Sequence, residues 1–256
     1  MIDQTILEEF KASFHGQLIL PSDEEYKEAC KIYNAMIERY PMMITRCANV
    51  ADVMSAVNFA RENDLLVAIR GGGHNGPGLG TCDDGLVIDL SPIKYTRVDN
   101  QAGTVQVGGG CTWGDVDHAT HAFGLATPSG VVSTTGVGGL TLGGGHGYLT
   151  RKYGLTIDNL LGADMVLADG SFVTVSIEEN QDLFWAIRGG GGNFGVVTEF
   201  RFKLHPVHTI IGGPTLWHRE HTTEVMKWFR DFIQQAPEDL YGFFAILTVP
   251  PGPPFP

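Results

Sequence analysis

Three glycine-rich segments constrain the fold of this chain more than any other feature. They occupy residues 70–78, 136–147 and 188–195. The chain holds 34 glycines, where average usage would give about 18, and the excess has no three-residue period. Because glycine lets backbone N–H groups approach an anion closely, we interpret the segments as loops around one extended anionic cofactor. Tight turns without a ligand are the alternative for any single segment.

Length and charge limit the class of partner. With 256 residues, 43% hydrophobic and 18% charged, the chain is expected to form one large domain or two small ones. The formal net charge of -12 argues against nucleic acid or an anionic membrane as partner, since both attract cationic surfaces. No apolar stretch approaches the roughly 20 residues of a membrane helix, and the first ten residues do not resemble a signal peptide. We therefore expect a cytoplasmic location.

Neither the cysteines nor the histidines indicate a metal site. The four cysteines form no CxxC pair and are expected to be reduced and mostly buried. They are Cys30, Cys47, Cys82 and Cys111. Two histidine pairs have i, i+3 spacing, namely His118 with His121 and His218 with His221. No second pair of ligands accompanies either one, so no metal is expected.

Hydrophobic periodicity predicts that helices alternate with short strands. The predicted helices span residues 24–39, 49–63, 112–123, 182–188 and 220–235. The predicted strands span residues 42–46, 65–69, 86–90, 96–98, 104–107, 162–167, 172–175, 196–204 and 241–248. Asp169 and Gly170 are expected to form the turn of a hairpin. The strand at 65–69 would lead directly into the first glycine segment.

Two matches to GxGxxG, at residues 71–76 and 190–195, raise the possibility of a dinucleotide-binding fold. That motif requires a strand before it and a helix after it, so that the helix N-terminus meets the pyrophosphate. Pro77 and Gly78 follow the first match and do not open a helix, while the second leads into a strand. No P-loop motif occurs either. The sequence therefore predicts neither a Rossmann fold nor a P-loop fold.

Four segments, at 69–75, 127–139, 143–159 and 183–198, together resemble a known family. They are similar to FAD-linked oxidases of the vanillyl-alcohol oxidase and p-cresol methylhydroxylase (PCMH) superfamily, and look most like its berberine-bridge-enzyme-like branch. The resemblance implies an α+β fold in which two α/β subdomains clasp FAD. It places a PCMH-type FAD-binding domain at residues 1–206, with its core at about 38–207. Residues 207–256 would begin an antiparallel-sheet substrate domain, about 150 residues of which would be missing.

The resemblance also implies roles for individual residues. His74 corresponds to the histidine whose imidazole bonds covalently to the 8α-methyl carbon of FAD. The glycine loops would hold the diphosphate through backbone N–H groups, and Gly195 with Val197 would contact the adenine or ribose. The expected cofactor-binding residues are Arg70, Gly71, Gly72, Gly73, His74, Asn75, Gly78, Pro128, Ser129, Val132, Thr135, Gly136, Gly138, Gly139, Gly143, His146, Gly195 and Val197. The catalytic residue is not assigned, and the candidates are His146, Tyr148 and Tyr153.

Two positions depart from the pattern of relatives or leave it open. Val132 stands where many relatives carry a cysteine that tethers the flavin a second time, so a single tether is predicted. Thr135 occupies the place where relatives use the size of one side chain to admit or exclude dioxygen. A threonine there leaves oxidase and dehydrogenase as alternatives.

The implied function is that of an FAD-dependent oxidoreductase acting on a CH–OH or CH–N bond of a small molecule such as a sugar, alcohol or alkaloid. Hydride would pass to flavin N5, and dioxygen or another acceptor would reoxidise the flavin. One alternative is an FAD-binding fragment without catalytic activity, because the C-terminal segment with the expected base is missing. Another is a fragment that does not fold stably, because apolar side chains of its last segment are exposed. These are Trp228, Phe229, Phe232, Phe243 and Phe244.

Overall fold

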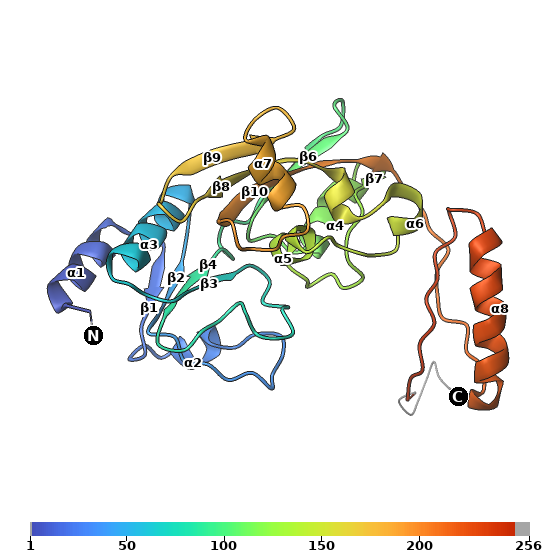
Figure 1. Cartoon of the computed structure of the whole chain (residues 1–256), viewed down its shortest axis with the longest axis horizontal. Coiled ribbons are helices and arrows are strands. Elements are labelled where there is room, and N and C mark those ends of the chain that lie inside the picture. Colours follow the sequence, from blue (N-terminus) through green and yellow to red (C-terminus); the bar gives the residue numbers. More distant parts are fainter. Residues whose placement is uncertain (1, 249–256) are drawn as a thin grey trace.

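Two β-sheets, built by successive parts of the chain, organise the fold (Figure 1). The computed structural model describes residues 2–248. A four-stranded sheet has the order β1-β2-β4-β3, and a five-stranded sheet has the order β5-β6-β10-β8-β9. A short ribbon pairs β11 with β7. Helices pack against both sheets, so the predicted α+β class is confirmed.

The elements have the following bounds. The strands are β1 Gln17–Ile19, β2 Met43–Arg46, β3 Val67–Arg70, β4 Leu86–Asp89, β5 Thr96–Asp99, β6 Thr104–Gly108, β7 Leu125–Ala126, β8 Leu160–Val166, β9 Phe172–Ser176, β10 Val196–Lys203 and β11 His205–Pro206. The α-helices are α1 Gln4–Ser13, α2 Tyr26–Ala29, α3 Val50–Glu62, α4 Trp113–His121, α5 Val137–Leu142, α6 Thr150–Tyr153, α7 Gln181–Ala186 and α8 Thr222–Gln235. Two 3₁₀ helices are η1 Thr156–Asn159 and η2 Arg219–His221.

The first glycine segment directly follows a strand of the four-stranded sheet. Strands β2 and β3 both run parallel to β4, and α3 forms the crossover between them. The side chain of Asn49 caps α3 by accepting from the Asp52 N–H, and the buried face of α3 carries Val53, Ala56 and Phe59. The first glycine segment begins where β3 ends, at the carboxyl edge of the parallel strands.

The five-stranded sheet is antiparallel throughout and carries the larger core. Val107, Phe200 and Phe202 point from its strands into this core, where Trp113 of α4 and Val137 of α5 meet them. Strands β8 and β9 form the predicted hairpin, and Gly170 has φ of 84° at its turn. The second glycine segment lies on the helix-covered side of this sheet, because α5 forms part of it.

The predicted helix at 24–39 is wrong, since only Tyr26–Ala29 is helical. The residues that follow bond instead to the first glycine segment. The Tyr33 N–H donates to the carbonyl oxygen of Gly73 at 3.1 Å, and the Asn34 amide donates to that of Gly76 at 2.8 Å. These contacts replace the backbone bonds of a helix.

The predicted strand at 241–248 is also wrong, because these residues have no regular secondary structure. A strand needs a hydrogen-bonded neighbour, and no strand of the described chain pairs with this segment. The remaining predicted helices and strands are confirmed within a few residues at their ends. The sequence did not predict α1, β1, the helix α5 inside the second glycine segment, or the short elements α6, η1, β7 and β11.

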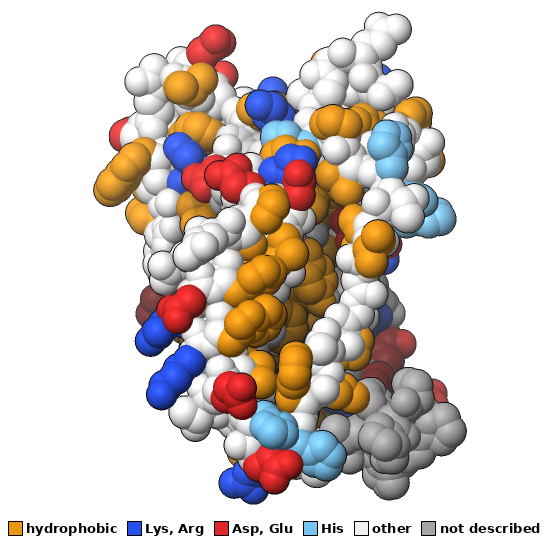
Figure 2. Space-filling model, turned by 90° about the vertical axis from the view of Figure 1, so that its right-hand side faces the viewer, with side chains coloured by type: hydrophobic (Ala, Val, Ile, Leu, Met, Phe, Trp, Pro, Cys, Tyr) orange, Lys and Arg blue, Asp and Glu red, His pale blue; other side chains and the backbone are white. Residues whose placement is uncertain are grey.

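After β11 the chain extends without regular structure to η2 and α8, which stand apart from the sheets at the right of Figure 1. Figure 2 faces this end of the molecule and shows hydrophobic side chains gathered along a hollow. Trp228, Phe232 and Phe243 are exposed as expected, whereas Phe229 and Phe244 are half-buried. Residues 249–256 of the predicted substrate domain lie outside the described residues. No helix in residues 2–248 combines the length and apolar character needed to cross a membrane.

Candidate cofactor site

The first and second glycine segments touch each other through their backbones. A Cβ atom on Gly72 would lie 2.3 Å from the amide nitrogen of Gly136, and a Cβ on Gly136 would lie 2.3 Å from that of Gly72. Real Cβ atoms do not come this close to backbone atoms, so both positions require glycine. The contact joins the loop after β3 to the N-cap of α5 and brings the predicted diphosphate loops together.

His74 lies at this junction. Its Nε2 is 3.1 Å from the hydroxyl of Thr134, and its Nδ1 is 3.4 Å from the hydroxyl of Thr135. Tyr33 stacks on the imidazole with ring centroids 4.0 Å apart. Burial lowers the pKa of His74, with an opposing contribution from the backbone of Thr134. The imidazole is thus held in one orientation and favoured in its neutral, nucleophilic form.

The glycine segment that contains this histidine carries backbone N–H groups without a hydrogen bond. Within the described residues, six N–H groups of the first glycine segment donate no hydrogen bond, namely those of Gly71, Gly72, Gly73, His74, Asn75 and Gly76. Gly138 and Gly139 of the second segment lie in the first turn of α5, whose N–H groups have no partner inside the helix. Space beside Gly139 is open, because a Cβ built there meets no atom within 4 Å. Gly73 and Gly78 have φ of 68° and 80°, a backbone form that turns successive N–H groups toward one point. These donors and this space fit a diphosphate.

The side chain of Arg70, which was predicted to bind the cofactor, is buried inside the protein. Its guanidinium donates to the Asp89 carboxylate at 2.8 Å and to the carbonyl oxygen of Ala29 at 2.7 Å. Arg70 and Asp89 are 6% and 4% exposed. The side chain therefore anchors the start of the glycine loop from inside the protein.

The segment around Ser129 and Val132 also contacts the second glycine segment. Pro128 is buried, and the carbonyl oxygen of Ser129 lies 1.8 Å from a Cβ built on Gly147, so these two backbones also touch. Val131 and Val132 are 49% and 41% exposed. Two exposed valines thus lie in the loop whose Thr134 and Thr135 contact His74.

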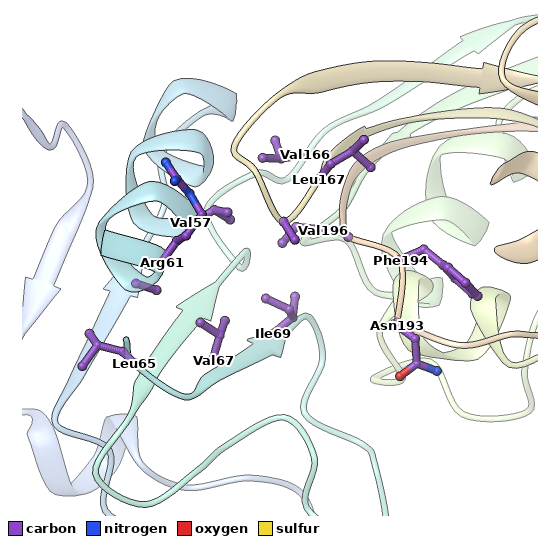
Figure 3. Close-up of a pocket in the computed structure, with 14 residues that line it drawn as sticks. Val57, Arg61, Leu65, Val67, Ile69, Val166, Leu167, Asn193, Phe194 and Val196 are labelled. Atoms are coloured by element: carbon purple, nitrogen blue, oxygen red, sulfur yellow. The ribbon is translucent and has the colours of Figure 1, made fainter. Parts of the chain in front are cut away.

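The third glycine segment borders a separate pocket of about 280 Å³ (Figure 3). Gly195 has φ of 148° and packs against the carbonyl oxygen of Val166. Figure 3 shows Val57 and Arg61 of α3 on one wall and Phe194 on the other. Val197, the other predicted adenine or ribose contact, is buried in β10 and does not line this pocket. The sequence did not predict this mostly apolar pocket.

The three candidate catalytic residues do not lie together. Tyr153 stacks on His205 with centroids 4.0 Å apart, and His205 in turn bonds to Asn159 at 2.6 Å. His146 and Tyr148 instead both contact Tyr241 from the segment after α8.

Two other predicted cofactor-binding residues have local structural roles. The side chain of Asn75 accepts a hydrogen bond from the Leu79 N–H at 2.9 Å, within the first glycine segment and its end. Gly143 forms the C-cap of α5.

Three residues at the site were missed by the sequence analysis: Tyr33, Thr134 and Tyr241. Tyr33 belongs to the segment predicted as a helix, and Tyr241 belongs to the segment predicted as a strand. Thr134 is next to Thr135 in a quoted motif, which is the only signal that pointed to it. The four cysteines are free and buried, as predicted. In residues 2–248, no group of three or more His, Cys, Asp or Glu side chains is placed to hold a metal ion.

Comparison with known proteins identifies similar chains. Residues 41–176, more than half of the chain, match a family described as FAD binding domain. The chain is 46% identical over 228 residues to an FAD-linked oxidoreductase of Dictyostelium discoideum, which covers 89% of this chain and 50% of that protein. It therefore spans about half the length of the curated relatives it matches.

Two solved structures are similar to this one. 6-Hydroxy-D-nicotine oxidase from Arthrobacter nicotinovorans matches with a TM-score of 0.75 and 40% identity, over 76% of this chain and 43% of that chain. A berberine-bridge-enzyme-like protein (BBE-like 1) from Physcomitrella patens matches with a TM-score of 0.74 and 35% identity, over 78% of this chain and 44% of that chain.

Proposed function

This chain belongs to the FAD binding domain family, in keeping with its motif resemblance to berberine-bridge-enzyme-like flavoproteins, and we propose that it holds FAD through a covalent bond to His74. In this proposal, residues 1–206 form the cofactor-binding part of an oxidoreductase and residues 207–256 begin its substrate domain. The substrate is a small molecule with a CH–OH or CH–N bond, such as a sugar, alcohol or alkaloid. Dioxygen or another acceptor takes the electrons.

The observation that carries this proposal is the placement of His74. Its imidazole is oriented by Thr134, Thr135 and Tyr33 beside a group of unpaired backbone N–H donors. An anion held by those donors needs no cationic side chain, which agrees with the acidic net charge of the chain. The loop that contacts His74 through Thr134 and Thr135 also carries the exposed Val131 and Val132, which supports a place for the flavin ring there.

Bound FAD supplies the hydride acceptor of the reaction. The residues of this chain orient and retain it. The backbone donors of the glycine loops would bind the diphosphate, the surface of Val131 and Val132 would support the flavin ring, and Thr135 would border it. Val132 offers no thiol, so His74 would be the single tether.

The tether forms with balanced atoms and electrons. His74 would give up its imidazole N–H proton and form a C–N bond to the 8α-methyl carbon, which would lose one C–H bond. The two protons and two electrons released would pass to dioxygen as oxidant, giving hydrogen peroxide. The depressed pKa of His74 favours this step, because only the neutral imidazole is a nucleophile.

Acid precipitation tests the proposal directly. The chain is purified, precipitated with acid and examined for yellow, fluorescent flavin in the pellet. We expect about one flavin per chain in the wild type and none in the pellet of His74→Ala. His118→Ala is the matched control, because His118 is an exposed histidine of α4 outside the glycine segments, and it should retain flavin like the wild type.

The outcomes separate the alternatives. If the flavin of the wild type is found in the acid supernatant and not in the pellet, the covalent bond is contradicted, but the proposal that the chain binds FAD still stands. Retained flavin that no alcohol, sugar or amine reduces supports the cofactor-binding fragment without catalysis. A polydisperse preparation without a cooperative melting transition supports the fragment that does not fold stably.

A further inference from the structure

One segment of the chain donates hydrogen bonds to four carbonyl oxygens of the loop that follows β3. This segment is residues 33–40, which contain no helix or strand, and we refer to it as the bracing segment. Its donors are the backbone N–H of Tyr33 and the side chains of Asn34 and Arg39. The acceptors are the carbonyl oxygens of Gly73, Gly76, Gly78 and Thr81.

The side chains of Asn34 and Arg39 make three of these four bonds. The Asn34 amide donates to the carbonyl oxygen of Gly76 at 2.8 Å. The Nη1 of Arg39 donates to the carbonyl oxygens of Gly78 at 3.1 Å and Thr81 at 2.9 Å. Both side chains are half-buried. The first glycine segment and its end are therefore tied to the bracing segment at several points.

The remaining bond fixes the direction of a peptide group at the proposed site. The C=O and N–H of a trans peptide group point in opposite directions. Because the Gly73 carbonyl points to the bracing segment, the N–H of His74 in the same peptide group points away from it. That N–H is one of the six in residues 71–76 that donate no hydrogen bond within the described residues. The bracing segment thus takes up carbonyl groups of the loop and leaves the His74 donor free on the opposite side.

A glycine-rich loop needs such support before it binds an anion. Gly71, Gly72 and Gly73 have no side chain to restrict their backbone, so a loop without support adopts many conformations. Only the fraction of molecules whose N–H groups already converge can bind, and the apparent affinity decreases by that fraction. Each bond from the bracing segment increases the fraction of loops that are ready for a diphosphate.

We propose that Asn34 and Arg39 are positioning residues for the cofactor, which hold the first glycine segment in the conformation that binds the diphosphate. This inference rests on the proposed function, because it takes the diphosphate to lie at this loop. Both side chains act through carbonyl oxygens of the loop. Arg39 contributes as a hydrogen-bond donor to the loop, and its charge is not what attracts the anion.

Calorimetric titration with ADP tests the proposal without relying on turnover. ADP carries the diphosphate and lacks the flavin ring, so its binding does not depend on the tether. The variants are made in the His74→Ala chain freed of FAD, because covalent flavin would otherwise occupy the site. We expect ADP to bind about 2- to 10-fold more weakly in Asn34→Leu, the net worth of one neutral hydrogen bond. Arg39→Met loses two bonds from a charged donor and should bind ADP at least about tenfold more weakly.

Two matched controls lose the same kinds of bond outside the glycine segments. The Asn63 amide donates to the carbonyl oxygen of Phe59 at 2.8 Å, at the C-terminus of α3. The Arg151 guanidinium donates to the carbonyl oxygens of Ile233 and Ala236, at the C-terminus of α8. Asn63→Leu and Arg151→Met should bind ADP within twofold of the His74→Ala chain. A merely structural role of the bracing bonds would lower the melting temperatures of all four variants without separating their ADP affinities.

Salt separates the positioning role of Arg39 from simple attraction of the anion. Attraction between an exposed charge and ADP is screened at about 0.5 M NaCl. A loop that has lost its support binds ADP poorly at any salt concentration. The weaker binding of Arg39→Met, measured relative to the His74→Ala chain, should therefore persist at high salt. Its disappearance at high salt would contradict the positioning role.

The flavin content of the wild-type chain is measured first, so that the two proposals fail in different ways. A wild type without flavin, together with a His74→Ala chain that does not bind ADP, contradicts the proposed function, and the inference falls with it. Unchanged ADP affinity in Asn34→Leu and Arg39→Met contradicts this inference alone.

A second measurement applies if the wild type retains flavin but the His74→Ala chain binds no ADP. Asn34→Leu and Arg39→Met are then made with His74 intact, and the flavin in their acid pellets is compared with that of the two matched controls. A lower flavin content than in the controls supports the inference, and an equal content contradicts it.

Discussion

Gly72, in the loop after β3, and Gly136, the N-cap of α5, touch backbone to backbone. A Cβ atom on either would lie 2.3 Å from the amide nitrogen of the other. This contact joins the two proposed diphosphate loops. It also explains why glycine is needed at positions where φ is ordinary, since neither residue has a positive φ.

The Gly72→Ala variant should lose about 1–3 kcal/mol of unfolding free energy, because the new methyl group collides with backbone that must move. It should also lose bound flavin, since the loops separate. Urea unfolding and flavin absorbance measure the two effects. Gly212→Ala is the control, because a Cβ there meets no atom within 4 Å. Equal stability of the two variants would contradict the tight contact.

Arg70→Met should reduce the unfolding free energy by about 3–5 kcal/mol, because it leaves the buried Asp89 carboxylate without its main partner. Arg46, whose Nε is 3.7 Å from the same carboxylate, keeps the loss toward the lower figure. Denaturant unfolding measures it. Arg61→Ala, which removes an exposed pair with Glu62, should cost no more than about 1 kcal/mol. A loss in Arg70→Met as small as that would show that the buried pair does not support the loop.

Arg151→Ala should release α8 from the cofactor-binding part of the chain. Two hydrogen bonds from a charged donor to the Ile233 and Ala236 carbonyls are lost, so amide exchange in Thr222–Gln235 should speed up about tenfold. Hydrogen–deuterium exchange with mass spectrometry measures this. In Arg230→Ala, where the arginine pairs with its neighbour Asp231, exchange should stay near the wild-type rate. Identical exchange in both variants would contradict the docking role of Arg151.

The stability of the protein should fall as the pH decreases below about 6.5, the ordinary pKa of histidine. Burial, helped by the charge of Lys203, lowers the pKa of His205 in the folded protein. The unfolded chain therefore binds this proton more readily, so the contribution is complete above the unfolded pKa and is lost as the pH falls through the folded pKa. His205→Gln should show a shallower decline of melting temperature between pH 7 and pH 5. His74 titrates in the wild type and in His205→Gln alike. An unchanged slope of melting temperature against pH would therefore mean that His205 does not contribute.

Local sequence patterns determined most of the regular structure and the residue types of the site. Alternating and continuous apolar runs predicted β2, β4, β6 and β10, and the helical periodicity of residues 49–63 predicted α3. The glycine segments predicted an anion-binding site around His74. These features depend on neighbours a few positions apart, which is why they are visible in the sequence.

The tertiary structure alone decided which of these residues meet. Tyr33 stacks on His74 because its segment bonds to carbonyl groups about 40 positions away instead of forming a helix. Tyr241 reaches His146 because Arg151 holds the end of α8, and Arg70 turns inward because Asp89 lies on the neighbouring strand. Contacts of this kind depend on how sheets and helices pack across long sequence separations, and no local periodicity encodes that packing.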